Sequence, residues 1–119
     1  MDRPDIQRIR HILVYCEKIE RAIARFGNDE SIFLSDEEYY LAVTMCILQI
    51  GELVNGLTEA FREKTRNQVP WAQIRGMRNI MAHQYSTVLK ERIWLTAISD
   101  IPALAAFCDE ILSQEEGNI

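Results

Sequence analysis

The stretch from Ser35 to Lys64 reads SDEEYYLAVTMCILQIGELVNGLTEAFREK, and its pattern decides the fold that the sequence predicts. Its first four residues form a capping box, in which Ser35 and Glu38 satisfy free N–H groups at a helix start. No proline follows before Lys64, so we expect one helix to about that residue. A helix apolar on more than one side is central to its bundle or shared with a second subunit. The apolar positions cover more than one stripe: Leu41, Val43, Met45, Ile47, Leu48, Ile50, Val54, Leu57 and Phe61.

Two more segments on either side of this stretch have helical patterns. Residues 4–26 place apolar side chains at steps of three and four, after Asp2 as a candidate cap and before the stop signal Gly27-Asn28. The other segment begins at Pro70, because proline is favoured in the first turn of a helix. Its apolar face consists of Trp71, Ile74, Met77 and Met81.

The last predicted helix covers about residues 90–113 and contains Pro102. Proline removes a helical N–H, so we expect a kink or a split there, with Ser99 or Asp100 starting the second piece. No segment shows a convincing strand alternation. The sequence therefore predicts an all-α protein, an antiparallel up-and-down four-helix bundle that forms one domain over residues 1–119.

The composition favours a soluble, cytoplasmic protein. The 119 residues contain no apolar run long enough to span a membrane, and the charged start MDRPDIQRIR does not have the pattern of a signal peptide. Cys16, Cys46 and Cys108 are widely spaced within apolar segments. This pattern is typical of reduced thiols in a core, and it favours neither disulfides nor a zinc site.

Positive charge is concentrated in one part of an acidic chain. The net charge is −5, yet residues 61–92 contain seven basic and two acidic residues, a local charge of +5 that leaves −10 on the other 87 residues. An anionic ligand could be attracted to this part of the protein. Ordinary charged helix surfaces would produce the same asymmetry.

The basic segment contains WAQIRGMRNIMAHQYSTV, residues 71–88. Arg75, Asn79 and His83 follow one another at steps of four, so they share one face of a helix. Arg78 and Tyr85 are seven residues apart and would also align if the helix continued to Tyr85. Because the apolar row faces the core, we expect these polar side chains to be exposed or to line a cleft.

These residue types suit the cleavage of RNA. Histidine moves protons near neutral pH, arginine matches phosphate oxygens, and asparagine can orient either group. A base would remove the proton of the 2′-hydroxyl, that oxygen would attack the adjacent phosphorus, and arginine would stabilise the developing charge. This scheme needs no metal, and no cluster of His and Cys predicts one. A solvated helix end would contain the same residues, so their chemistry alone leaves both interpretations open.

The octapeptide RNIMAHQY, residues 78–85, resembles the Arg-x(4–6)-His signature of the HEPN superfamily. It is more closely similar to the HepT-type toxins of toxin–antitoxin pairs, whose motif is Arg-Asn-x-x-x-His-x-Tyr. The stretches FLSDEEYYLAVTMCILQIGELVNGL, VPWAQIRGMRNIMAHQY and ISDIPALAAFCDEIL resemble the family's second, third and last helices. The resemblance implies a HEPN-like helical homodimer that acts as a metal-independent RNase without a cofactor.

The resemblance also implies roles for individual residues. Arg78 and His83 match the catalytic pair, and Asn79 matches the supporting polar position. Tyr85 matches the tyrosine that accepts AMP from the family's partner, a minimal nucleotidyltransferase antitoxin of the MntA type. From its position on the same helix row, Arg75 is expected to bind substrate.

Other residues are interpreted from their own positions in the chain. Glu52 on the long helix is a candidate for orienting Arg78 across the cleft. We expect His11 to lie at the surface or in an interface, and Trp71 and Trp94 to anchor the core. Two alternatives to an RNase stay open. One is a non-catalytic homodimer that binds nucleotide or a nucleotidyltransferase partner, and the other is a purely structural interaction bundle.

Overall fold

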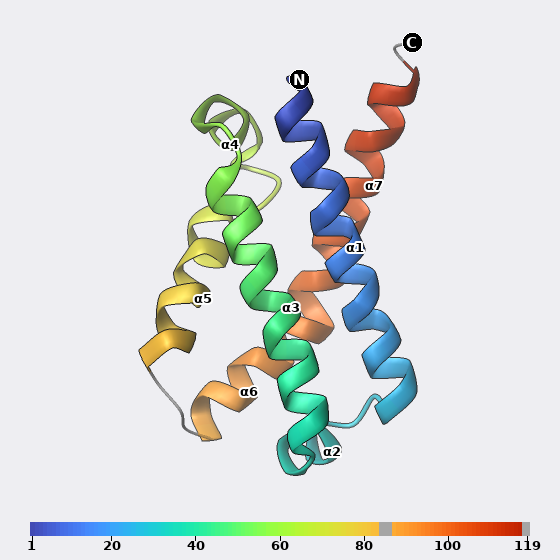
Figure 1. Cartoon of the computed structure of the whole chain (residues 1–119), viewed down its shortest axis with the longest axis vertical. Coiled ribbons are helices and arrows are strands. Elements are labelled where there is room, and N and C mark those ends of the chain that lie inside the picture. The colour runs from blue at the N-terminus through green and yellow to red at the C-terminus, as the bar shows by residue number, and fades with distance from the viewer. Residues whose placement is uncertain (84–86, 118–119) are drawn as a thin grey trace.

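The computed structural model describes residues 1–83 and 87–117, and the side chains of these residues except 79–83, 87 and 88. Within the described residues the chain forms helices joined by short connections, with no strand (Figure 1). The predicted all-α class is confirmed. The four predicted segments divide further, into α1 (Arg3–Phe26), α2 (Glu30–Ser35), α3 (Glu37–Gly56), α4 (Glu59–Thr65), α5 (Trp71–His83), α6 (Thr87–Leu95), a π-helical turn (Thr96–Asp100) and α7 (Ile101–Gly117).

The helix α3 lies at the centre of the arrangement. It packs against α1 on one side and α5 on the other, while α7 packs against α1. Figure 1 shows α1, α3, α5 and α7 alternating in direction, with α6 crossing obliquely near the end opposite the two termini. This alternation of helix direction is expected of an up-and-down topology. It places α5 and α3 side by side.

The ends of α1 are those that the sequence predicts. The Asp2 carboxylate accepts a hydrogen bond from the Asp5 N–H at 2.8 Å, which caps the first turn. Gly27 ends the helix with φ of 123°, a backbone conformation that favours glycine. The Tyr39 hydroxyl donates to the Gly27 carbonyl at 2.9 Å, which ties this end of α1 to the start of α3.

The predicted capping box at Ser35 is wrong. Ser35 ends the short helix α2, and its hydroxyl donates to the carbonyls of Ser31 and Ile32. The cap of α3 is Asp36, whose carboxylate accepts from the Tyr39 N–H at 3.1 Å. An aspartate is as good a cap as a serine, so the choice between neighbours depends on where the preceding turn ends.

The continuous helix predicted to Lys64 is also wrong, because the chain leaves the helix at Leu57 with φ −65° and ψ 147°. The axis of α4 is bent by 107° from that of α3. The buried Asp5 carboxylate, 2% exposed, accepts from the Thr58 N–H at 3.0 Å and from its hydroxyl at 2.6 Å. These bonds replace the helical ones and fix the bend. In the described part of the chain no single helix is both long and apolar enough to cross a membrane, and only the bent α3–α4 pair, taken together, meets both conditions.

Pro70 and Pro102 act near the positions that the sequence predicts. The Pro70 carbonyl accepts from Gln73 and Ile74, and α5 starts one residue later, at Trp71. The last segment is split before Pro102, as predicted. The second piece, α7, starts at Ile101 and not at Ser99 or Asp100, which lie within the π-helical turn. The Ile101 N–H bonds to the Thr96 carbonyl, five residues back, and Pro102, which follows, has no N–H to continue the ladder.

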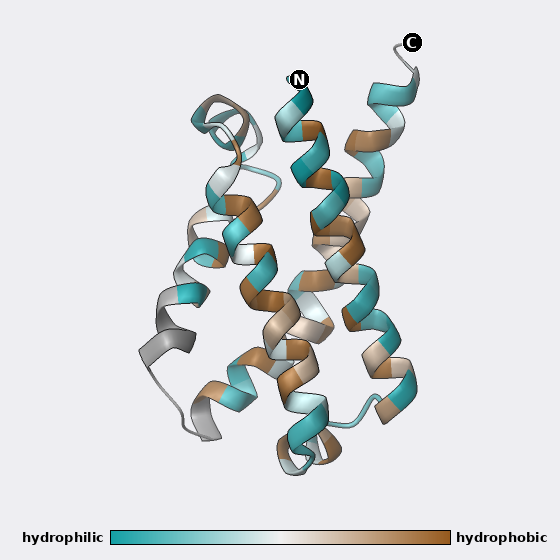
Figure 2. Ribbon diagram, in the orientation of Figure 1, coloured by the Kyte–Doolittle hydropathy of each residue, from teal (hydrophilic) through white to brown (hydrophobic). Residues whose placement is uncertain are grey.

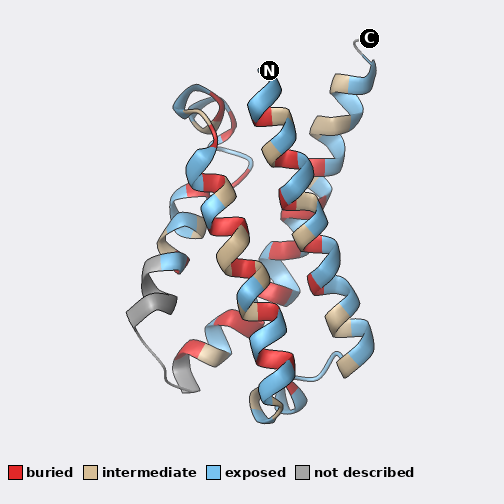
Figure 3. Ribbon diagram, viewed as in Figure 1, coloured by how far each residue is buried: buried red, intermediate tan, exposed pale blue. Residues whose placement is uncertain are grey.

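Buried apolar side chains from the helices form the core. The ribbons coloured by hydropathy and by burial mark where apolar and buried residues lie along each helix (Figures 2 and 3). Two aromatic clusters mark the two halves of the core, and each contains one predicted tryptophan anchor. One cluster is Phe33, Tyr39 and Trp94, and the other is Phe61, Trp71 and Phe107. Trp71 Nε1 also donates to the buried Thr65 hydroxyl at 2.8 Å, so its polar atom is satisfied.

The three thiols are free, as predicted, and Cys16 and Cys108 lie in the core. Burial raises the pKa of the Cys108 thiol to about 12 and raises that of Cys16 further. Cys46 is half-buried between α3 and α1, where burial raises its pKa while Lys18 and Arg21 oppose the shift. The two buried cysteines therefore behave as small apolar groups and not as nucleophiles.

The predicted second apolar side of α3 is present. Leu41 and Met45 lie one helical turn apart and are 55% and 56% exposed, although the rest of α3 contributes heavily to the core. Large apolar side chains exposed to this extent on one helix face are candidates for a contact with another molecule.

Candidate functional site

The candidate site lies where α5 packs against α3. Gly51 on α3 faces α5, and a methyl group built on it would lie 3.5 Å from Cβ of Arg78 and 3.7 Å from the Ile74 carbonyl oxygen. A methyl group at these distances would make ordinary van der Waals contact, so the two helices lie close together at Gly51. This approach brings Arg78 beside Glu52, the next residue of α3.

Arg78 and Glu52 form an ion pair between the two helices. Arg78 Nε lies 2.6 Å from Glu52 Oε1, and the two side chains are 45% and 53% exposed. A pair this exposed adds little to stability, but it fixes the direction of the guanidinium group. Because the contact uses Nε, the two terminal nitrogens of Arg78 form no ion pair with any described residue and can meet another anion. Glu52 thus makes the contact with Arg78 that the sequence suggested.

The same two helices enclose a shallow depression of about 300 Å³, open to solvent. It is lined by Gly51, Asn55, Ala72, Arg75, Gly76 and Arg78. The structure therefore brings Arg75 and Arg78 to one wall, with the Asn55 amide opposite them on α3. Among the described residues Arg75 forms no ion pair, so its charge is available to an anion in the depression. Asn55 is a lining residue that the sequence analysis did not single out.

The remaining motif residues continue along α5 or beyond it. His83 is the last residue of α5, five positions after Arg78, or about 7.5 Å along the helix axis. The side chains of Asn79 and His83, and all of Tyr85, lie outside the described residues. The contact of Arg78 with His83 and the alignment of Arg78 with Tyr85 stay predictions. His11 is exposed on α1, where it lines a shallow groove with residues of α3.

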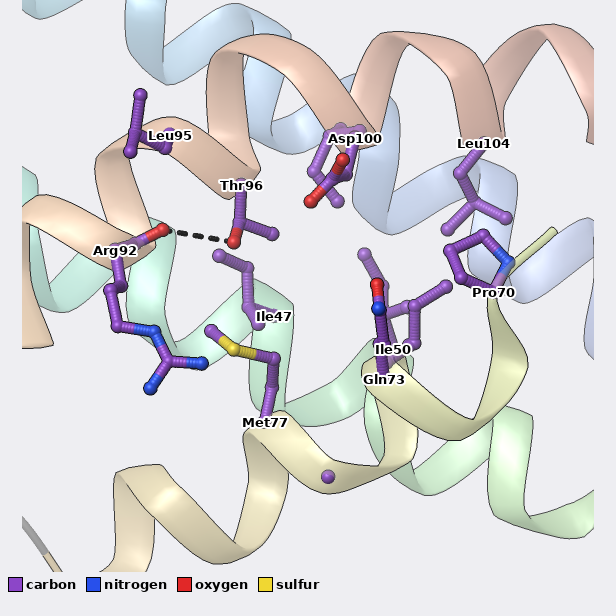
Figure 4. A pocket seen from close by; sticks show the side chains of 13 residues that line it. Ile47, Ile50, Pro70, Gln73, Met77, Arg92, Leu95, Thr96, Asp100 and Leu104 are labelled. Atoms are coloured by element: carbon purple, nitrogen blue, oxygen red, sulfur yellow. Dashed lines mark hydrogen bonds between the residues drawn. The ribbon is translucent and has the colours of Figure 1, made fainter.

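A larger cavity of about 490 Å³ lies on the other side of α5, between α3, the π-helical turn and α7 (Figure 4). Its walls are mostly apolar, with Ile50, Met77 and Leu104 among them, while Arg92 and Asp100 bring opposite charges to it. Thr96 turns its hydroxyl to the Arg92 carbonyl at 2.9 Å and lines the same cavity. No sequence pattern indicated this cavity, because it forms only where the irregular π-helical turn faces α5.

Comparison with known proteins gives consistent matches. A protein of Caldanaerobacter subterraneus subsp. tengcongensis named "Putative RNase TTE0752" is 34% identical over 108 residues, which cover 91% of this chain and 94% of that protein. "Putative RNase MJ1216" of Methanocaldococcus jannaschii is 30% identical over 118 residues, 98% of this chain and 95% of that protein. "Probable ribonuclease HepT" of Thermococcus cleftensis is 31% identical over 72 residues, 60% of this chain and 64% of that protein.

No solved structure matches the chain at a significant level. The model of one family, described as ribonuclease HepT-like, matches residues 12–111 and so includes the whole of α3 and α5 with the Arg-Asn-x-x-x-His-x-Tyr motif. The match confirms the resemblance on which the motif was interpreted, and the chain belongs to the ribonuclease HepT-like family.

Proposed function

We propose that this protein is a metal-independent endoribonuclease, the toxin of a toxin–antitoxin pair, with Arg78 and His83 as its catalytic residues. The observation that carries the proposal is the orientation of Arg78. Glu52 holds its Nε at 2.6 Å, at the edge of an open depression that Arg75 also lines. An arginine fixed in this way can receive a phosphate on its terminal nitrogens. Membership of the ribonuclease HepT-like family supports the same activity.

The proposed reaction is an in-line transfer within RNA. His83 takes the proton of the 2′-hydroxyl, and the 2′ oxygen forms a bond to the adjacent phosphorus while the bond from phosphorus to the 5′ oxygen breaks. The leaving 5′ oxygen receives a proton from the imidazolium or from water, so the products are a 2′,3′-cyclic phosphate and a 5′-hydroxyl. Arg78 stabilises the charge that develops on the phosphorus oxygens, and Asn79 orients the groups.

Cleavage assays on cellular RNA test this proposal, with wild type compared with Arg78→Ala and His83→Ala in the presence of a chelator. Each variant should lose at least about 10²-fold in activity. Its free energy of unfolding should change by less than about 1 kcal/mol, because neither position belongs to the apolar row of α5. A DNA oligomer should not be cut, because it has no 2′-hydroxyl. Normal cleavage by both variants, or cleavage that stops when metal is chelated, would contradict the proposal.

We also propose that a minimal nucleotidyltransferase inactivates the protein by transferring AMP to Tyr85. An AMP group two residues after His83 would place a phosphate near Arg78, which would pair with it in place of the RNA phosphate. The modification would therefore block cleavage while the helical fold stays intact. Support comes from the motif, in which every position that the family requires is present.

Mass spectrometry after incubation with the nucleotidyltransferase and ATP tests this second step. We expect one AMP adduct on Tyr85 and none on the Tyr85→Phe variant, which should keep cleavage activity in the presence of the partner. An adduct on Tyr15, Tyr39 or Tyr40 would exclude the mechanism. A stable complex with nucleotide or with the partner, without cleavage by the free protein, would instead support the non-catalytic binding module.

A further inference from the structure

Arginines from three helices surround the last turn of α3. Arg62 of α4 donates from Nη1 to the Val54 carbonyl at 3.5 Å. Arg75 of α5 lines the depression with Asn55. Arg8 of α1 lies over Gly56, because a methyl group built on Gly56 would be 2.7 Å from Arg8 Nε. Each of three consecutive residues of α3 thus has an arginine near it: Val54, Asn55 and Gly56.

The negative end of the α3 dipole explains only part of this arrangement. Arginine at a helix C-terminus can stabilise the last carbonyls, and Arg62 donates to that of Val54, which also accepts from the Leu57 N–H. Arg75 instead faces an open depression and has no ion pair within the described part of the chain. Among the described residues, Arg8 forms one long ion pair, with Nη1 at 3.9 Å from a carboxylate oxygen of Asp5, and that carboxylate already accepts two hydrogen bonds from Thr58.

We infer that Asn55 and Arg8 extend the Arg75–Arg78 depression into a second subsite for RNA phosphates, on the side of Arg78 away from His83. This inference rests on the proposed function. Single-stranded RNA then runs along the groove between α5 and α3, from the end of α5 toward the last turn of α3. Arg75 and Arg8 contact its phosphates, and the Asn55 amide donates to a phosphate or sugar oxygen between them.

Salt-dependent binding of an RNA that cannot be cut tests the subsite separately from catalysis. A single-stranded RNA with 2′-O-methyl groups has no nucleophile, so its binding can be followed by fluorescence anisotropy over a range of salt concentrations. Each phosphate contact on a single strand contributes about −0.7 to the slope of log affinity against log salt. The loss of one contact should therefore weaken binding about fivefold at about 0.1 M salt.

Arg8→Ala should lower the magnitude of the slope by about 0.7, and Arg8→Lys, which keeps the charge, should restore it. Asn55→Glu should weaken binding by repelling phosphate. The matched control is Arg21→Ala, an exposed arginine on the same helix, about 20 Å from Arg8 along its axis, which should bind like wild type. Thermal unfolding of each variant shows that the fold is kept.

In a length series, the effect of Arg8→Ala should appear only for oligomers long enough to reach from Arg78 to the end of α3.

Each failure has a separate meaning. If Arg8→Ala and Asn55→Glu both keep the wild-type slope and affinity, the subsite is overturned, and RNA follows another path. A second outcome is that wild type binds the methylated RNA with the expected salt slope and the expected effects of Arg8→Ala and Asn55→Glu, yet does not cleave unmodified RNA. In that case the proposed nuclease activity fails while the subsite stands. If wild type binds no RNA, both are overturned.

Discussion

In the candidate site, one contact fixes the direction of the Arg78 side chain. An arginine on a solvent-facing helix surface has several rotatable bonds and samples many directions. Here the Glu52 carboxylate lies 2.6 Å from Nε of Arg78, and Arg78 lines the depression. Glu52 touches neither the substrate nor the reacting atoms in the proposed reaction, so we regard it as a positioning residue.

Substitution of Glu52 by Gln should separate turnover from binding. Glu52→Gln removes a negative charge from the depression, so KM for RNA should stay the same or fall. The value of kcat should fall about tenfold, because the guanidinium is no longer held for the transition state. The matched control is Glu63→Gln, which breaks the exposed surface pair with Arg66, 3.2 Å long, and should alter neither constant. A rise in KM with unchanged kcat would contradict the positioning role.

At the scale of elements, the join between α3 and α4 positions the end of the groove. The chain turns by 107° there, and the turn is held by a carboxylate from the first turn of α1. The Thr58 hydroxyl has two roles, because it donates to Asp5 and accepts from the Phe61 N–H at 3.2 Å as the cap of α4. The groove that ends at Asn55 therefore depends on a contact between the start of α1 and the end of α3.

Substitution of Asp5 should destabilise the connection between α3 and α4. Asp5→Ala removes a buried carboxylate and leaves the half-buried Thr58 N–H without its partner, so the free energy of unfolding should fall by about 1–3 kcal/mol. Asp29→Ala removes the cap of α2 at an exposed position and serves as the control, with a smaller expected loss. Urea unfolding followed by circular dichroism measures both. Equal stability of the two variants would show that the Asp5–Thr58 contact does not hold the bend.

At the scale of the whole molecule, no described residue covers the exposed apolar side of α3. Leu41 and Met45 are more than half exposed on the helix that also forms the centre of the core. Exposed apolar side chains of this size on a central helix favour contact with a second copy, and two copies meeting along α3 would also bring two depressions near each other.

We therefore expect a homodimer that a charge on this face disrupts. Light scattering of wild type should give about twice the 13.8 kDa of one chain. Met45→Glu should shift the mass toward that of a single chain, because a dimer would have to bury the new carboxylate. The control is Ile98→Glu on the π-helical turn, which is also exposed but far from α3 in sequence. A monomeric wild type, or a dimer that Met45→Glu leaves intact, would exclude this interface.

The sequence by itself determined the helical class, the limits of α1, the start of α5 to within one residue, the break before Pro102 and the two tryptophan anchors. These features depend on periodicity, caps and proline chemistry, all of which act within a few residues along the chain. The motif determined that Arg78 and His83 belong to one helix, five residues apart, for the same reason. Ser35 was predicted as a cap and Asp36 took that place, because two adjacent residues had the same capping chemistry.

The tertiary structure alone decided which distant residues meet. The bend after Gly56 comes from a carboxylate 53 positions away in sequence, so no local pattern between Ser35 and Lys64 could reveal it. Glu52 was a candidate by its position, but its contact with Arg78 requires the packing of α5 against α3. Asn55 and Arg8 had no motif to mark them. Asn55 lines the depression and Arg8 lies against Gly56 only because the packing of α1, α3 and α5 brings them there. Periodicity within one helix carries no information about that packing.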